Sequence, residues 1–67
     1  MAYTMKAGTG KETVFGWAYC QIIEDRESVT FLATKSRNIA LGIASNKPGV
    51  VWCRYYTIVD GNKVICC

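Results

Sequence analysis

Residues 50–67 read VVWCRYYTIVDGNKVICC, and this stretch carries the clearest structural signal in the chain. Its first ten residues, 50–59, are rich in the β-branched and aromatic side chains that favour strands. The Asp-Gly and Gly-Asn pairs that follow suit the positive φ angles of a tight hairpin turn. The chain then returns as VICC, so the stretch predicts a β-hairpin. Because neighbouring strand residues point to opposite faces, we expect one of Cys66 and Cys67 to be a core thiol and the other to lie near an edge or a neighbouring subunit.

Three more segments predict strands, over 2–7, 13–23 and 29–35. The segment 13–23 (TVFGWAYCQII) has the strongest strand composition, and the polar stretch 24–28 (EDRES) after it predicts a turn. A chain of 67 residues is one domain at most. The sequence therefore predicts a single small all-β domain over residues 1–67, an antiparallel meander or barrel of five to six short strands.

One segment, SRNIALGIASNKPG at 36–49, fits two structures. As a helix near 37–45, it would have Ser36 as its N-cap and would place Ile39 and Ile43 on one face. As a strand, its large and small residues would alternate between the two faces. The regular alternation, together with a glycine in the middle, favours the strand.

The two longest predicted strands lack a polar face. In 13–23, aromatic residues alternate with Val, Ala, Cys and Ile, and 50–59 shows a similar pattern. A sheet with one face in water should alternate apolar with polar residues. Either both faces are covered within a barrel or sandwich, or one face meets another chain. Burial and conformational entropy nearly cancel in so small a chain, so we expect a homo-oligomer.

Composition also bounds the cellular setting. Hydrophobic residues make up 51% and charged residues 19%, which is typical of a globular chain. There is no apolar run long enough for a membrane span, and the first residues lack the apolar core of a secretory signal. We expect a cytoplasmic protein with free thiols and no membrane partner. In an oxidising compartment, Cys20 and Cys53 would be candidates for a bridge between neighbouring strands, and the protein would be secreted.

Catalytic motifs are scarce. The chain has no histidine, which removes the commonest general base and metal ligand. The stretch AGTGKET at 7–13 differs from a phosphate loop, because Met5 stands in the first glycine position and Glu12 replaces the Ser or Thr that follows the lysine. A carboxylate there would repel phosphate, so a Gly-rich turn is the better interpretation. We expect no enzyme activity, no cofactor and no metal site.

Aromatic and basic residues interleave in WCRYY at 52–56, and FGWAY supplies further rings. Such rings can pack in a core, form an interface or stack on bases while cations meet phosphate. The predicted ligand-binding or partner-binding residues are Trp17, Tyr19, Trp52, Arg54, Tyr56, Lys35 and Arg37.

The sequence therefore predicts a small, non-enzymatic binding module that inhibits or sequesters a partner protein or ligand through an aromatic-rich sheet surface. One alternative is a small β-barrel that binds nucleic acid or a small nucleotide, since the aromatic rings can stack on bases while Arg54 pairs with phosphate. A further alternative is a secreted, disulfide-linked toxin or antimicrobial protein, since the chain has four cysteines.

Overall fold

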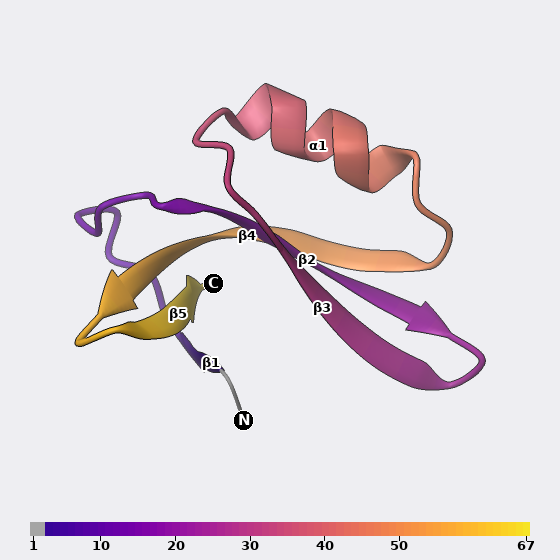
Figure 1. The fold of residues 1–67 in the computed structure, drawn as a ribbon, viewed down its shortest axis with the longest axis horizontal. Helices are drawn as coiled ribbons and strands as arrows, with labels where there is room; N and C mark the ends of the chain where they lie inside the picture. Colours follow the sequence, from indigo (N-terminus) through magenta and orange to yellow (C-terminus); the bar gives the residue numbers. More distant parts are fainter. Residues whose placement is uncertain (1–2) are drawn as a thin grey trace.

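The computed structural model describes residues 3–67, which form five strands and one helix (Figure 1). In chain order these are β1 (Tyr3–Lys6), β2 (Gly16–Ile23), β3 (Arg26–Leu32), α1 (Arg37–Ser45), β4 (Val50–Val59) and β5 (Asn62–Cys66). The strands form one curled sheet in the shape of a half-barrel. The predicted all-β class is confirmed.

The strand order across the sheet is β1-β5-β4-β2-β3. The pairs β2–β3, β2–β4 and β4–β5 are antiparallel. The pair β1–β5 is parallel, with Tyr3 opposite Lys63 and Lys6 opposite Cys66, so the meander is not antiparallel throughout. The physical reason is the long connection over residues 7–15, which carries the chain from β1 past β5 and β4 before β2 begins.

Both hairpins have two-residue turns with positive φ angles, the geometry that matches strand twist. Asp60 and Gly61 join β4 to β5 with φ angles of 52° and 80°, which confirms the predicted C-terminal hairpin. Glu24 and Asp25 join β2 to β3 with φ angles of 52° and 59°. The predicted turn over 24–28 was therefore too long, since β3 already begins at Arg26.

One face of the sheet holds an aromatic core. Ala18, Tyr56 and Ile65 are buried there, and the partly buried residues packed against them are Tyr3, Val29, Phe31 and Trp52. The Phe31 ring contacts Tyr56 edge to face, with centroids 5.0 Å apart. It also contacts Tyr3 at 5.8 Å, although β3 and β1 are the two outer strands of the sheet. The sheet therefore curls around this core, which we call the inner face.

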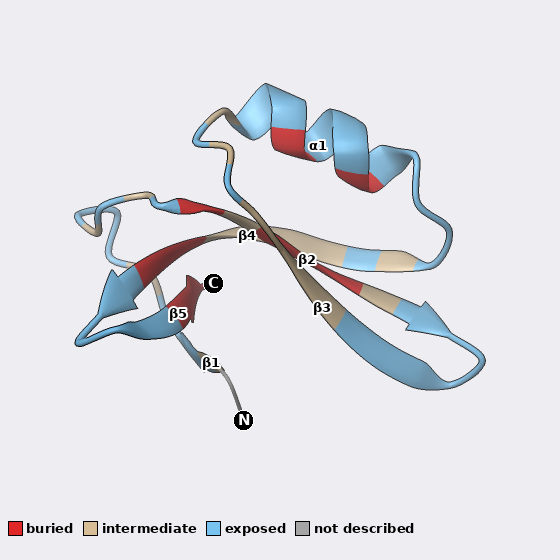
Figure 2. Cartoon of the chain, in the orientation of Figure 1, coloured by how far each residue is buried: buried red, intermediate tan, exposed pale blue. Residues whose placement is uncertain are grey.

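The opposite, outer face is covered by other parts of the same chain. Tyr19 and Cys53 are cross-strand partners on this face, because each is one residue removed from the inner-face pairs. Helix α1 packs on β4 and β2 at this point, and its buried residues are Ala40 and Ala44 (Figure 2). The chain itself therefore covers the part of the outer face around Tyr19 and Cys53.

The structure shows a helix where alternation favoured a strand. Ser36 is the N-cap and accepts a hydrogen bond from Ile39 N, as the helical alternative predicted. Alternation was misleading because Ala40 and Ala44, four residues apart, form a small buried face on the helix. Their size lets α1 approach the sheet closely. The larger residues Ile39 and Ile43 are left exposed on its flank.

Candidate partner-binding groove

A groove of about 550 Å³ lies between α1 and the first half of β4. One side is formed by the helix, the end by the loop after it, and the other side by the strand. The lining residues are Leu41, Ala44, Ser45, Lys47, Gly49, Val50, Val51, Trp52 and Cys53. We call this the α1–β4 groove. It is mainly apolar, and it is not filled by any other segment of residues 3–67.

The strand side of this groove is an open sheet edge. Strand β5 pairs with β4 only over Tyr56–Val59, so the residues 50–55 have a neighbouring strand on the β2 side alone. Phe15 N donates to Tyr56 O, which shows that the backbone of Tyr56 faces β2. Because orientation alternates along a strand, the N–H and C=O of Cys53 face the other way, toward the groove side. A register shift opposite Cys20/Gln21 adds a bulge at the start of this segment.

Of the free sheet edges, this one is the least protected against pairing with another chain. Edge strands are usually protected from such pairing because they are short, carry charged residues or are covered by another element. Strand β1 is only four residues long and ends in Lys6, and β3 starts with Arg26 and Glu27. By contrast, Val50–Cys53 carries no charge, and the Val51 side chain is 59% exposed. The open edge of β4 can therefore accept an added strand.

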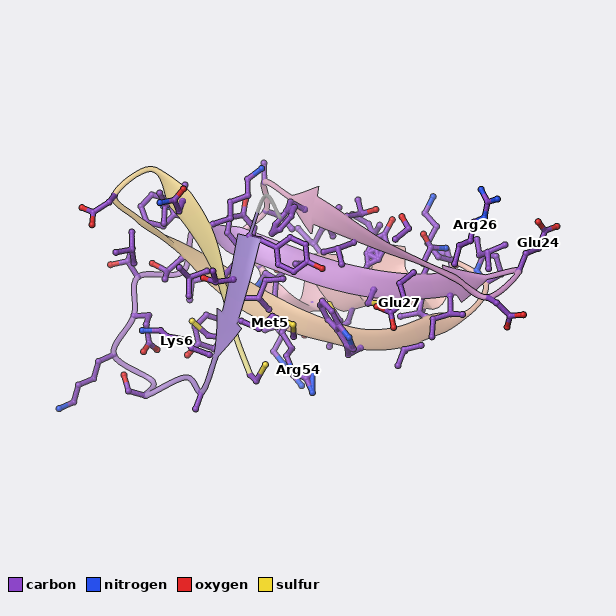
Figure 3. All side chains as sticks on the ribbon, turned by 90° about the horizontal axis from the view of Figure 1, so that it is seen from below. Met5, Lys6, Glu24, Arg26, Glu27 and Arg54 are labelled. Carbon is purple, nitrogen blue, oxygen red and sulfur yellow. The ribbon has the colours of Figure 1, made fainter. Side chains whose placement is uncertain are left out.

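The electrostatic environment of the groove is positive. Lys47 lines it. The Arg54 guanidinium instead lies on the inner face over the ring of Trp52, with 5.7 Å from its guanidinium carbon to the ring centroid. Burial raises the pKa of the Cys53 thiol, while the nearby charge of Arg37 acts in the opposite direction. No ion pair joins these cations to a carboxylate within residues 3–67. Figure 3 shows Arg54 projecting from the sheet, far from Glu24 at the end of the β2–β3 hairpin.

The predicted site residues do not form one surface. Trp17 and Tyr19 lie on the outer face, whereas Trp52, Arg54 and Tyr56 lie on the inner face. Tyr19 and Tyr56 are buried and serve the core. Lys35 lies in the loop between β3 and α1, and Arg37 is the first residue of α1. Of the seven, the structure brings Trp52 and Arg37 near the α1–β4 groove.

Sequence reasoning missed the residues that shape the groove, namely Leu41, Lys47 and Val51. One signal was present in the sequence. The run VVWC at 50–53 begins before the hairpin partner VICC can reach it, because β4 has ten residues and β5 only five. Unequal strand lengths in a hairpin leave part of the longer strand without a partner on that side.

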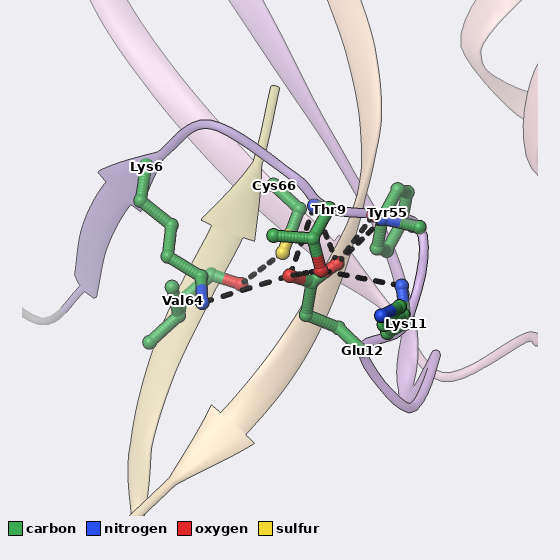
Figure 4. A network of polar contacts seen from close by, with 8 residues as sticks. Lys6, Thr9, Lys11, Glu12, Tyr55, Val64 and Cys66 are labelled. Carbon is green, nitrogen blue, oxygen red and sulfur yellow. Dashed lines mark hydrogen bonds and ion pairs between the residues drawn. The ribbon is translucent and has the colours of Figure 1, made fainter.

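The Gly-rich loop binds the carboxylate of one of its own residues, Glu12 (Figure 4). The Glu12 carboxylate accepts hydrogen bonds from Thr9 N at 3.0 and 3.1 Å, from Gly10 N at 3.2 Å and from Thr9 Oγ1 at 2.7 Å. Tyr55 OH donates to it at 2.8 Å, and Lys6 Nζ lies 3.7 Å away. Hydrogen bonds from the Thr9 side chain and backbone, then from Tyr55, lower the pKa of Glu12 to about 2. This carboxylate fastens the loop to the outer face.

The loop position explains why it is glycine-rich. A Cβ at Gly8 would meet the Tyr55 hydroxyl at 2.6 Å and the Cys66 Cβ at 3.2 Å, so the backbone approaches the sheet more closely than other residues allow. Gly10 has a φ of 81°, which turns its N–H toward Glu12. The loop thereby covers the part of the outer face that α1 does not reach.

The four cysteines are free thiols. The suggested Cys20–Cys53 bridge is wrong for this fold, because Cys20 pairs with Trp52 while Cys53 pairs with Tyr19, which puts the two thiols on opposite faces. Cys66 is buried and Cys67 is exposed, which confirms the expected division of the terminal pair into one core thiol and one outside the core.

No group of three or more metal-ligating side chains is assembled within residues 3–67. In the same part of the chain, no helix has the length and apolar character needed to cross a membrane. No protein-family model, curated protein or solved structure matches this chain. The fold and the groove therefore define the class on physical grounds, as a curled half-barrel with one covering helix and an open strand edge.

Proposed function

We propose that the protein is a small, non-enzymatic binding module that self-associates and that inhibits or sequesters a partner protein by holding an extended segment of it in the α1–β4 groove. The observation that carries the proposal is the uncharged open edge of β4 over Val50–Cys53. An added strand gains main-chain hydrogen bonds there, and side chains of alternate residues enter the groove.

The surroundings of the edge add specificity. Leu41 and Val51 are exposed apolar residues on the two walls, with exposed fractions of 36% and 59%. Lys47 and Arg37 supply positive charge without carboxylate partners in residues 3–67. A segment that combines apolar residues with carboxylates fits both properties, since opposite charges steer association and disfavour wrong partners.

The aromatic residues contribute to this function indirectly. Trp52 packs on the inner-face core and is covered on one side of its ring by Arg54. A base that stacked on this ring would have to displace the guanidinium first. The arrangement therefore favours recognition of protein over recognition of nucleic acid, and the tightly packed rings hold the β4 edge rigid.

The test is site-specific photo-crosslinking in lysate of the native host. A photoreactive amino acid replaces Val51 in one variant and Val59 in the control variant. The two valines lie on the same strand and are both exposed, at 59% and 48%, but only Val51 lines the groove. We expect a crosslinked partner protein from position 51 and not from position 59.

A competition step makes the test specific. An excess of unlabelled wild-type protein should remove the crosslink. An excess of Val51→Lys protein should not, because a lysine on an open strand edge disfavours pairing with another strand. Equal crosslinking from positions 51 and 59, or equal competition by V51K, would contradict the proposal.

A further inference from the structure

The β2–β3 hairpin ends in an exposed tip that combines apolar and acidic residues. The tip is formed by Ile22, Ile23, Glu24 and Asp25. The two isoleucines are 40% and 49% exposed, and both acidic residues occupy the turn itself. Neither carboxylate forms an ion pair or accepts a hydrogen bond within residues 3–67. We call these four residues the β2–β3 tip.

The α1–β4 groove has the complementary properties. It presents Leu41 and Val51 as apolar walls and Lys47 at its end, with Arg37 near the lining residue Cys53. No residue of the β2–β3 tip lines the groove of its own chain. The apolar and acidic chemistry that the groove accepts is therefore present in this molecule on residues that do not line its own groove, so a second copy can supply it.

Tip and groove lie at the same end of the molecule. Ile22 N donates a 2.9 Å hydrogen bond to Gly49 O, so the β2–β3 tip adjoins the loop that closes the groove. Figure 1 shows the turn between β2 and β3 and the loop from α1 to β4 at one end of the ribbon. Two copies related by a two-fold axis at that end can each present a tip to the groove of the other.

We propose that two copies of this chain form a reciprocal dimer, in which the β2–β3 tip of each copy occupies the α1–β4 groove of the other. Ile23 then contacts the apolar walls, and Glu24 faces Lys47. The exposed apolar area and the unpaired charges at this end of the molecule are covered together. Both tips and both grooves are then occupied, so no further copy can be added to the dimer.

The dimer itself does not require the proposed function, but its consequence for regulation rests on that function. Because the tip and a partner segment would occupy the same groove, dimerisation and partner binding exclude one another. The partner has to compete with the second copy, and its apparent affinity falls as the concentration of the protein rises. In the dimer both grooves are occupied and cannot bind the partner, whereas the monomer can bind it.

The experiment is charge exchange, read by light scattering coupled to size exclusion at micromolar concentration. The wild type should elute with twice the 7.4 kDa chain mass. Glu24→Lys and Lys47→Glu should each weaken dimerisation about tenfold or more, because each reciprocal dimer contains the altered contact twice. The matched control is Asp60→Lys, which reverses a charge at the other hairpin turn, also at positive φ, and should leave the dimer unchanged.

Mixing E24K with K47E supplies the decisive readout. In the mixed dimer, the substituted position 24 of one copy faces the substituted position 47 of the other with the two charges exchanged. The second contact joins the unchanged Lys47 of the E24K copy to the unchanged Glu24 of the K47E copy. The mixture should therefore form the dimer again. The double variant E24K/K47E should also dimerise alone. A monomeric wild type, a larger assembly, or a dimer that E24K leaves intact would each overturn the inference.

The outcomes for dimer and partner are separable. If the wild type is monomeric while Val51 still crosslinks a different protein, the reciprocal dimer is wrong and the proposed function stands. If charge exchange controls the dimer but V51K competes for the partner as well as wild type does, the proposed function is wrong and the dimer stands.

Discussion

Tyr3 and Phe31 come from the two outer strands of the sheet, yet their rings meet edge to face with centroids 5.8 Å apart and planes at 67°. The same Phe31 ring contacts Tyr56 at 5.0 Å, and Lys63 Nζ lies 4.5 Å from its centroid. One side chain thus joins residues of several strands across the inner face. The Tyr3–Phe31 contact requires the sheet to curl, because β1 and β3 are not neighbours in the sheet order.

Phe31→Ala should therefore destabilise the protein by about 2–3 kcal/mol, below the full range for buried phenylalanines because Phe31 is only partly buried. Urea unfolding followed by circular dichroism measures this. The matched control is Phe15→Ala, since Phe15 is 42% exposed and belongs to no aromatic pair among the described residues. Equal losses from the two variants would show that Phe31 does not hold the outer strands together.

The hydrogen bonds to Glu12 should appear in the pH dependence of stability. Its pKa in the folded state is about 2, against an ordinary 4.5. A lowered pKa means that the stabilisation is fully present above pH 4.5 and is lost as the pH falls toward 2. Thermal midpoints of wild type and Glu12→Gln should thus differ most at neutral pH and converge in acid. The control Asp60→Asn removes a carboxylate that has no ion pair or hydrogen bond among the described residues, and it should leave the thermal midpoint at neutral pH nearly unchanged.

Two glycine substitutions should have opposite signs. Gly42 lies within α1, and a Cβ there meets no atom within 4 Å, so Gly42→Ala should stabilise the protein by up to about 1 kcal/mol. A Cβ at Gly16 would collide with the backbone oxygen of Leu32 and crowd the Tyr56 ring. Gly16→Ala should consequently lower the unfolding midpoint in urea. A destabilised G42A would mean that the exposed side of α1 is in contact with something, such as another copy.

The thiols should react in an order set by burial. Cys67 is exposed, whereas burial raises the pKa values of the Cys20 and Cys66 thiols and keeps both away from reagent. Ellman's reagent should modify Cys67 first and the two buried thiols only after unfolding, and Cys53, which is partly exposed, should react at an intermediate rate. Cys67→Ser should abolish the fast phase. A fast phase that survives in C67S would contradict the assignment of Cys66 to the core.

Much of the candidate site lay beyond sequence reasoning. The groove depends on how far α1 sits from β4, and this distance is set by Ala40 and Ala44, which the sequence shows only as small residues in an ambiguous segment. The aromatic residues Tyr19 and Tyr56 resemble binding residues in the sequence because rings serve cores and interfaces alike. Which of the two roles applies depends on what covers each face, and that is a property of the whole fold.

Local chemistry along the chain was enough to predict most of the strands, the C-terminal hairpin and the all-β class. The strand propensity of 13–23 and 50–59 and the Asp60–Gly61 turn act over a few residues, so a single sequence reveals them. The choice of helix over strand at 37–45, the parallel pairing of β1 with β5 and the open edge of β4 were decided only in the folded chain. Each depends on contacts between residues far apart in the chain. Alternation cannot distinguish a strand face from a small-residue helix face until the surface beneath it is known.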